Sequence, residues 1–271
     1  MSFHDALASH IQSHDSLLCV GLDPDPARIP AHLGSGTTAV YTFCREIIAA
    51  THDVVAAFKP NIAFFEAMGP AGIETLARLM ALPRHNLWIL DAKRGDIGNT
   101  ASAYASAAFD QFDADAITVN PYLGGDALAP FLERPERGAF VLCRTSNPGS
   151  RDIQELTLAD GRPLYMAVAH MAQHDWNTQR NVGLVVGATQ PAALAEVRQL
   201  CPDLPLLLPG IGAQGGDLAQ ALQAGLDAQR SGLLINTSRS VLYASSGTDF
   251  AQAARAEALR TQAAINTIRY T

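Results

Sequence analysis

The chain contains only two lysines, Lys59 and Lys93, although it carries 19 cationic residues. All the other cationic residues are arginines. A lysine ammonium is a compact point charge that can give up a proton, whereas an arginine guanidinium stays charged. We therefore expect the two lysines to lie where a transferable proton or a point charge is needed. The alternative is that the two lysines remain by chance as ordinary surface residues. Their positions along the chain distinguish between the two interpretations.

Lys93 belongs to a dense polar cluster, Asp-Ala-Lys-Arg-Gly-Asp at 91–96. Residues two apart on a β-strand point to the same side, so Asp91 and Lys93 should project together. Gly95 permits a sharp turn that would bring Asp96 back beside them, and Lys59 is expected from the adjacent strand. Two ammonium groups would then alternate with two carboxylates. The structural alternative is a buried ion-pair network that only fixes strand register, but such networks stabilise weakly and arginine would serve as well.

A second cluster, at 209–217, matches the dinucleotide pattern G-x-G-x-x-G through Gly210, Gly212 and Gly215. We reject a dinucleotide site because the motif comes late in the chain and no acidic residue follows about 20 positions later to bind a ribose. A glycine-rich turn that opens a helix still presents backbone N–H groups to an anion. With Arg239 further along, it fits the phosphate site formed by the last two loops of a barrel. A flexible turn and a surface arginine are the alternative.

Other polar residues give weaker signals. Asp23 suits a sugar-hydroxyl acceptor or, equally, a loop cap before Pro24, and the polar stretch at 143–150 suits a lid or a loop that binds the edge of a ligand. His170 and His174 are one helical turn apart but have no carboxylate companion, so we expect no metal site. No serine lies in a G-x-S-x-G elbow, which leaves nucleophilic hydrolysis without support.

The elements that position these residues repeat in a regular way. Most gaps between short apolar runs hold segments with helical spacing, at 38–50, 62–81, 98–110, 163–176, 191–200 and 216–225, and the helical segment 249–268 follows the last run. Apolar strands alternating with amphipathic helices predict a parallel sheet buried on both faces. Eight such units in about 250 residues predict a (β/α)8 TIM barrel, with an open doubly wound sheet as the rival. The eight apolar runs are 17–22, 54–58, 87–92, 115–119, 139–143, 182–187, 205–209 and 231–235.

Active sites of such barrels lie at the carboxyl ends of the strands. Both lysines of the chain lie at the predicted strand ends, which argues against chance survival on the surface. The polar and glycine residues expected at these ends are Asp23, Lys59, Asp91, Lys93, Asn120, Thr145, Ser146, Gly210, Gly212, Ser238 and Arg239.

Composition limits the class of protein further. With 271 residues, 48% hydrophobic and 17% charged, the chain can form a full core, and we predict one domain over 1–271. No apolar run is long enough to cross a membrane, and the N-terminus lacks a secretory signal. The net charge of −7 argues against a nucleic-acid partner. Four scattered cysteines disfavour a zinc site and a disulfide framework, so we expect a soluble protein in a reducing, cytoplasmic setting.

Several motifs together resemble orotidine 5′-phosphate decarboxylase, most closely its longer bacterial, type 2 branch. The resemblance runs in the family's order from about Leu18 to Tyr243, and the block at 91–100 is the most diagnostic. The motifs that carry it are Lys-Pro-Asn at 59–61, Asp-Ala-Lys-Arg-Gly-Asp-Ile-Gly-Asn-Thr at 91–100, Thr-Ser-Asn-Pro-Gly at 145–149, the glycine-rich segment 209–217, and Asn236 with Ser238 and Arg239.

The resemblance implies a (β/α)8 barrel that converts orotidine 5′-monophosphate to UMP, the last step of de novo pyrimidine synthesis, without metal or cofactor. It implies that Lys93 donates a proton to C6 and that Asp91 lies beside the departing carboxylate. Lys59 and Asp96 would complete a charged tetrad, with Asp96 supplied by the partner subunit of a homodimer.

Substrate-binding roles follow from the same resemblance. Asp23 and Lys59 would bind ribose hydroxyls, helped by Thr100 of the partner subunit. Ser146 and Gln214 would bind the pyrimidine, and Gln214 would also reach the phosphate. Arg239 and the loop containing Gly210 and Gly212 would hold the phosphate. At this phosphate contact, the segment 236–240 departs from the Gly-Arg pair of shorter relatives.

The implied chemistry makes physical sense. Loss of CO2 leaves a carbanion that no cofactor delocalises, so a fixed ammonium near C6 must stabilise the charge and then protonate it. Neighbouring carboxylates keep that ammonium charged. One alternative is a metal-assisted sugar-phosphate decarboxylase, which would need a carboxylate ligand in place of Lys59. The other is a non-catalytic barrel that binds a phosphate ligand.

Overall fold

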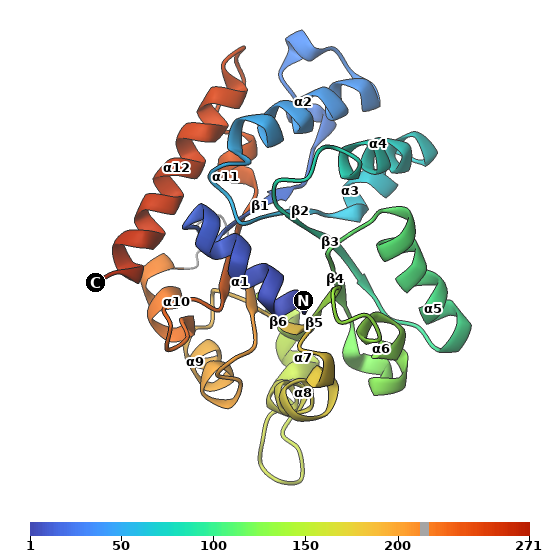
Figure 1. The fold of residues 1–271 in the computed structure, drawn as a ribbon, viewed down its shortest axis with the longest axis vertical. Coiled ribbons are helices and arrows are strands. Elements are labelled where there is room, and N and C mark those ends of the chain that lie inside the picture. Colours follow the sequence, from blue (N-terminus) through green and yellow to red (C-terminus); the bar gives the residue numbers. More distant parts are fainter. Residues whose placement is uncertain (212–216) are drawn as a thin grey trace.

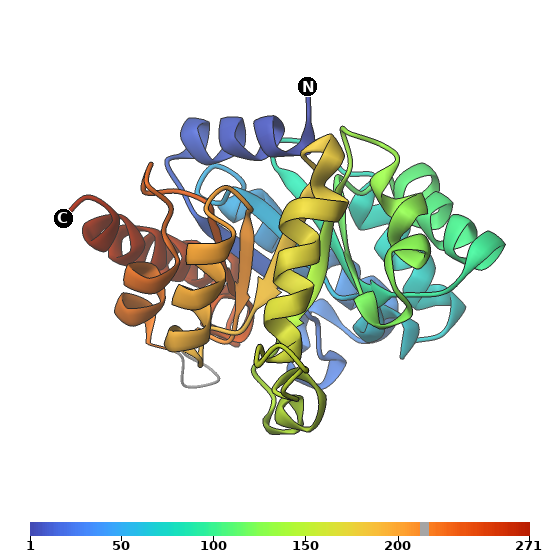
Figure 2. The same ribbon diagram turned by 90° about the horizontal axis from the view of Figure 1, so that it is seen from below.

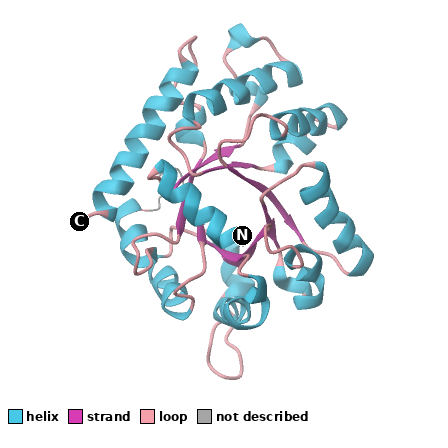
Figure 3. Cartoon of the chain, viewed as in Figure 1, coloured by secondary structure: helices cyan, strands magenta, loops and turns pink. Residues whose placement is uncertain are grey.

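The computed structural model describes residues 1–211 and 217–271. Eight parallel strands pair in sequence order, and β1 pairs with β8, which closes the barrel. The predicted (β/α)8 barrel is therefore confirmed, and the open-sheet rival is wrong. Figure 3 shows the strands around the centre and the helices outside them. The strands are β1 Leu18–Leu22, β2 Ala57–Pro60, β3 Leu87–Arg94, β4 Ala116–Val119, β5 Gly138–Arg144, β6 Val182–Val186, β7 Leu206–Pro209 and β8 Leu233–Thr237.

The strands are apolar along their length because both of their faces are covered. Every residue of β1, β4, β6 and β8 is buried. One face of each strand points into the barrel and the other packs against the helical ring (Figure 1), so these strands show little of the alternation expected for a half-exposed sheet.

The predicted helical segments are recovered, with breaks at specific residues. Segment 62–81 forms two helices because Gly69, with φ of +69°, and Pro70 interrupt it. Segments 98–110 and 163–176 both end in a π-helical turn. The helices are α1 Phe3–His14, α2 Gly36–Thr51, α3 Ile62–Glu66, α4 Pro70–Met80, α5 Gly98–Ser106, α6 Gly125–Leu132, α7 Arg151–Gln154, α8 Leu164–Met171, α9 Pro191–Leu200, α10 Leu218–Gly225, α11 Arg239–Leu242 and α12 Phe250–Arg269.

Helix α1, which the periodicity did not predict, lies across one end of the barrel (Figure 2). The Phe3 ring is completely buried and makes an edge contact with Phe140, with ring centroids 5.8 Å apart. Gly138, the first residue of β5, leaves room for it, because a Cβ there would lie 2.5 Å from the ring. Helix α1 therefore covers the amino end of the barrel, while the loop after β5 protrudes from the opposite end (Figure 2).

None of the helices in the described part of the chain has the length and apolar character required to cross a bilayer. The cysteines at positions 19, 44, 143 and 201 are all buried and free.

Candidate active site

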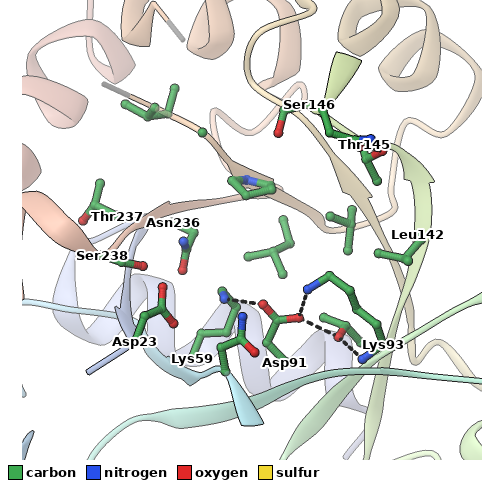
Figure 4. A pocket seen from close by; sticks show the side chains of 18 of the residues that line it. Asp23, Lys59, Asp91, Lys93, Leu142, Thr145, Ser146, Asn236, Thr237 and Ser238 are labelled. Carbon is green, nitrogen blue, oxygen red and sulfur yellow. Dashed lines mark hydrogen bonds and ion pairs between the residues drawn. The ribbon is translucent and has the colours of Figure 1, made fainter. Parts of the chain in front are cut away.

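A cavity of about 510 Å3 opens at the carboxyl ends of the strands. Its lining includes both lysines of the chain, together with Asp23, Asp91 and Ser146. Figure 4 shows that the labelled side chains come from strands on opposite sides of the barrel and point toward a common space. The prediction that the polar strand-end residues converge is therefore confirmed for these side chains.

Asp91 lies between the two lysines. Its Oδ2 accepts a hydrogen bond from Lys59 Nζ at 2.7 Å, and its Oδ1 accepts one from Lys93 Nζ at 2.6 Å. The Lys59 side chain is only 6% exposed, whereas the Lys93 side chain is 49% exposed. Lys93 is thus the more accessible of the two ammonium groups, whereas Lys59 lines the cavity with little of its side chain exposed.

The charge states of the buried pair follow from the balance of burial and charge. Burial alone would lower the pKa of Lys59, but the negative charges of Asp91 and Asp23 outweigh it and raise that pKa above the usual lysine value. Burial alone would raise the pKa of Asp91, but Lys59 and Lys93 outweigh it and lower that pKa well below the usual aspartate value. Both groups are therefore charged at neutral pH, and the cavity contains a preformed electric field.

Lys93 does not continue the regular strand from which its direction was predicted. Its φ is +49°, in the left-handed region that non-glycine residues rarely adopt. The register between β3 and β4 shifts between Leu90 and Arg94, so the strand bulges at this point. The conclusion that Asp91 and Lys93 share the cavity is right, but the local backbone is a bulge and not an extended strand.

Asp23, Asn236 and Ser238 lie on one side of the Lys59–Asp91 pair, and Lys93 lies on the other (Figure 4). Asp23 Oδ1, Asn236 Oδ1 and Thr237 Oγ1 are buried and have no hydrogen-bond partner among the residues described. Buried polar atoms are normally paired. Three unpartnered polar atoms in the lining of one cavity offer hydrogen-bonding positions to a ligand that carries several hydroxyl or amide groups.

The loop after β5 forms another wall of the cavity through Thr145, Ser146 and Gln154. The Thr145 N–H donates to Gln154 Oε1 at 2.8 Å, which joins the two ends of the loop. Gly187 lets the loop approach β6, because a Cβ at that position would lie 2.9 Å from Ser146 N. Ser146 is therefore placed in the cavity by the backbone, as predicted.

Arg144 anchors the same loop from below. It is 1% exposed and donates to Thr145 O at 2.7 Å, to Ser150 Oγ, and to Glu155 Oε1 at 2.5 Å. No role for Arg144 was predicted from the sequence, although a buried arginine at a strand end needs several acceptors.

The opposite wall contains Gly210, Ser238 and Arg239. Gly210 has φ of +102°, a conformation that a side chain would strain. Of the residues predicted to hold a phosphate, Gly210 and Arg239 therefore line the cavity, and their binding of a phosphate stays a prediction. Two other predicted residues of this wall, Gly212 and Gln214, lie outside the described part of the chain.

Three residues singled out from the sequence do not line the cavity of their own chain: Asp96, Thr100 and Asn120. The expected return of Asp96 through a turn at Gly95 is wrong within one chain, since the Asp96 carboxylate accepts from the neighbouring Ile97 N–H at 2.8 Å. Asn120 caps the turn that follows β4, where its Oδ1 accepts from Tyr122 N. Three of the four predicted tetrad groups therefore converge in one chain.

The structure adds Thr118, whose hydroxyl donates to Asp91, to the residues found by sequence. Its position inside β4 gave no signal, because a threonine within an apolar strand does not differ in sequence from an ordinary strand residue. Among the residues described, no three histidine, cysteine, aspartate or glutamate side chains are arranged to hold a metal ion.

A closed parallel barrel with a lysine–aspartate–lysine network at its carboxyl end defines a class of barrel enzyme that acts through fixed charges. The chain belongs to the orotidine 5′-phosphate decarboxylase / HUMPS family, whose sequence model matches residues 16–256. The family resemblance predicted from the motifs is therefore confirmed; the assignment to the type 2 branch stays a prediction.

Individual relatives match almost the whole chain. An orotidine 5′-phosphate decarboxylase of Roseiflexus sp. (strain RS-1) is 58% identical over 266 residues, covering 98% of each chain. One from Cupriavidus taiwanensis is 52% identical over 272 residues, covering both chains fully. The solved structure of Leishmania donovani OMP decarboxylase is 46% identical, with a TM-score of 0.88 over the full length of both chains.

Proposed function

We propose that the protein is a carboxy-lyase that decarboxylates orotidine 5′-monophosphate to UMP in pyrimidine biosynthesis, with no cofactor. The observation that carries this proposal is the Lys59–Asp91–Lys93 network at the floor of the cavity. Family membership and relatives of this name at 58% and 52% identity support it.

The roles of the charged residues follow from their exposure. Lys93 is the proton donor to C6, because its ammonium is half exposed to the cavity and is held in place by its ion pair with Asp91. Asp91 faces the substrate carboxylate and orients the Lys93 ammonium through their hydrogen bond. A carboxylate facing the substrate carboxylate would also raise the energy of the ground state. As CO2 leaves, the negative charge that develops at C6 is stabilised and then neutralised by Lys93.

The binding groups are assigned to the rest of the lining. The unpaired Asp23 Oδ1 and the buried Lys59 are suited to ribose hydroxyls, and Ser146 on the loop after β5 is suited to the pyrimidine. Arg239 and the backbone at Gly210 are suited to the phosphate. Gln214 and Gly212 keep their proposed contacts to pyrimidine and phosphate.

Asp96 and Thr100 are proposed to act in the cavity of a second subunit of a homodimer. Three large apolar side chains near them are exposed: Ile97 by 60%, Tyr122 by 77% and Leu123 by 46%. They follow the carboxyl ends of β3 and β4, the rim that contains Asp96. Burial of this apolar rim against a copy of itself would carry Asp96 toward the partner's Lys93.

A cytoplasmic location is proposed on the basis of the four free, buried cysteines, which suit a reducing compartment.

The proposal is tested by following the loss of orotidine 5′-monophosphate spectrophotometrically with purified protein, with and without EDTA. Turnover that EDTA leaves unchanged is expected. Turnover abolished by EDTA would favour the metal-assisted alternative, which Lys59 opposes because an ammonium beside Asp91 repels a cation. No turnover, but tight binding of UMP, would indicate a non-catalytic barrel that binds a phosphate ligand.

A further inference from the structure

Thr118, in the middle of β4, is 1% exposed and uses all the hydrogen-bonding capacity of its hydroxyl. Its Oγ1 donates to Asp91 Oδ1 at 2.9 Å. The same oxygen accepts from Ala92 N at 3.0 Å and from Lys93 N at 2.9 Å. A hydroxyl offers one donor and two acceptor sites, so Thr118 is saturated by three contacts to a single segment of β3.

On the side that faces β4, that segment has lost its regular strand pairing, although Asp91 still pairs with Asn61 on the other side. Leu90 pairs with Ile117, and the next pair in the ladder is Arg94 with Val119. The segment 91–93 therefore stands opposite Thr118 alone. Two consecutive N–H groups, of Ala92 and Lys93, are turned toward one side-chain oxygen instead of a backbone carbonyl.

The bulge is also where Lys93 adopts its left-handed φ of +49°. The left-handed conformation is energetically unfavourable for a lysine. It therefore persists only where surrounding contacts stabilise it. The hydrogen bond from Lys93 N to Thr118 Oγ1 is a contact that holds the backbone there. The Lys93 ammonium, in turn, binds the same Asp91 Oδ1 that Thr118 contacts.

We infer that Thr118 is a positioning residue for the decarboxylation: its hydroxyl holds the bulge of β3 and orients Asp91, and so places the Lys93 ammonium at the reacting carbon. This inference rests on the proposed function. Thr118 acts through Asp91 and Lys93, and no contact of its own with substrate is required.

The test compares Thr118→Val, which keeps the shape but removes the hydroxyl, with Thr118→Ser, which keeps the hydroxyl. We expect Thr118→Val to lower kcat about 100-fold, in the range found when a preorganised hydrogen bond is lost, with the Kd for UMP changed less than about threefold. Thr118→Ser should remain within about tenfold of the wild-type kcat. Thr51→Val is the matched control, because Thr51 is buried and its hydroxyl donates only to Ile47 O in its own helix α2.

A folded Thr118→Val with nearly wild-type kcat would overturn the inference, as would a Thr118→Ser enzyme as slow as the valine variant. Should the valine variant not fold, Thr118→Ala is compared with Thr118→Ser, since both remove the methyl group and differ in the hydroxyl. Equal kcat for these two would also overturn it.

Failure of the proposed function is recognised separately, as absence of decarboxylation by the wild-type protein. In that event, crystal structures of the wild type and of Thr118→Val test whether Thr118 holds the backbone conformation of Lys93. Loss of the left-handed conformation at Lys93 in the variant supports the role of Thr118, and its retention contradicts it.

Discussion

Lys59 Nζ lies 2.7 Å from Asp91 Oδ2, with both side chains less than a tenth exposed. The other oxygen of Asp91 binds Lys93, whose side chain is half exposed. One carboxylate therefore joins a lysine fixed inside the barrel to a lysine that faces the cavity. Lys59 helps to keep Asp91 charged and in place, and Asp91 in turn positions the Lys93 ammonium.

Replacement of Lys93 by arginine tests the transferable proton directly. Lys93→Arg should fold normally and keep its positive charge, yet lose turnover by at least about 10³-fold, because a guanidinium does not give up a proton. Arg260→Lys is the control, since Arg260 is an exposed residue of α12. Steady-state kinetics and circular dichroism measure the outcome. Substantial residual turnover by Lys93→Arg would remove the proton-donor assignment.

Mutation of the buried pair should be strongly non-additive. Asp91→Leu alone leaves the buried Lys59 ammonium without its hydrogen-bonded carboxylate and should lower the free energy of unfolding by about 3–5 kcal/mol. Lys59→Met leaves Asp91 paired with Lys93 and should cost less. The double variant removes both charges and should lose less than the sum of the two single losses. Urea unfolding at neutral pH measures all four proteins. Additive losses would mean that the two side chains do not interact in the folded protein.

The same pair predicts how stability depends on pH. The folded-state pKa of Asp91 is lowered below its unfolded value of 3.8, so its contribution is present above pH 3.8 and is lost as pH falls toward the folded value. The pKa of Lys59 is raised above 10.5, so its contribution is full below pH 10.5 and is lost as pH rises further. The double variant should lack both dependences in urea unfolding. An unchanged pH profile in that variant would assign them to other groups.

Arg144 is expected to govern the shape of the loop after β5. Arg144→Met removes the contacts to Ser150 and Glu155 and should raise KM about tenfold or more through Ser146, with a smaller change in kcat. Cleavage by a protease between 145 and 155 should also become faster. Arg198→Met is the control, because Arg198 is likewise buried but donates to Gly225 and Leu204 at the other end of the barrel. Equal KM effects of the two variants would assign Arg144 a role in stability alone.

Mixed dimers test whether Asp96 acts across an interface. Asp96→Ala and Lys93→Ala homodimers should each be inactive. Heterodimers formed by joint refolding should regain activity, because one of their two sites then contains both native residues, and statistical mixing sets a limit of about a quarter of the wild-type rate. Size-exclusion chromatography with differently tagged chains verifies the heterodimer. No recovery in verified heterodimers would contradict a shared site.

The amino-acid sequence was sufficient to predict the features that depend on residues close together along the chain, namely the strands, the helices and the residues at the strand ends. The eight apolar runs and the helical spacing between them predict the barrel, since both faces of each strand must be apolar when helices cover the outside. The spacing of Asp91 and Lys93, and their place at a strand end, predict a shared cavity. Lys59 is placed correctly although β2 begins later than its apolar run, because the run ends close to the strand end.

Tertiary structure alone decided the features that depend on strand register and on residues far apart in the sequence. The three contacts of Thr118 exist only because β3 gains residues against β4, and a shift of register leaves no mark in the pattern of either strand. The closure of the barrel end by α1 depends on Phe3 meeting Phe140. Asp96 is absent from the lining of its own chain's cavity for the same reason: the path of a loop is set by what packs around it, and local spacing does not contain that information.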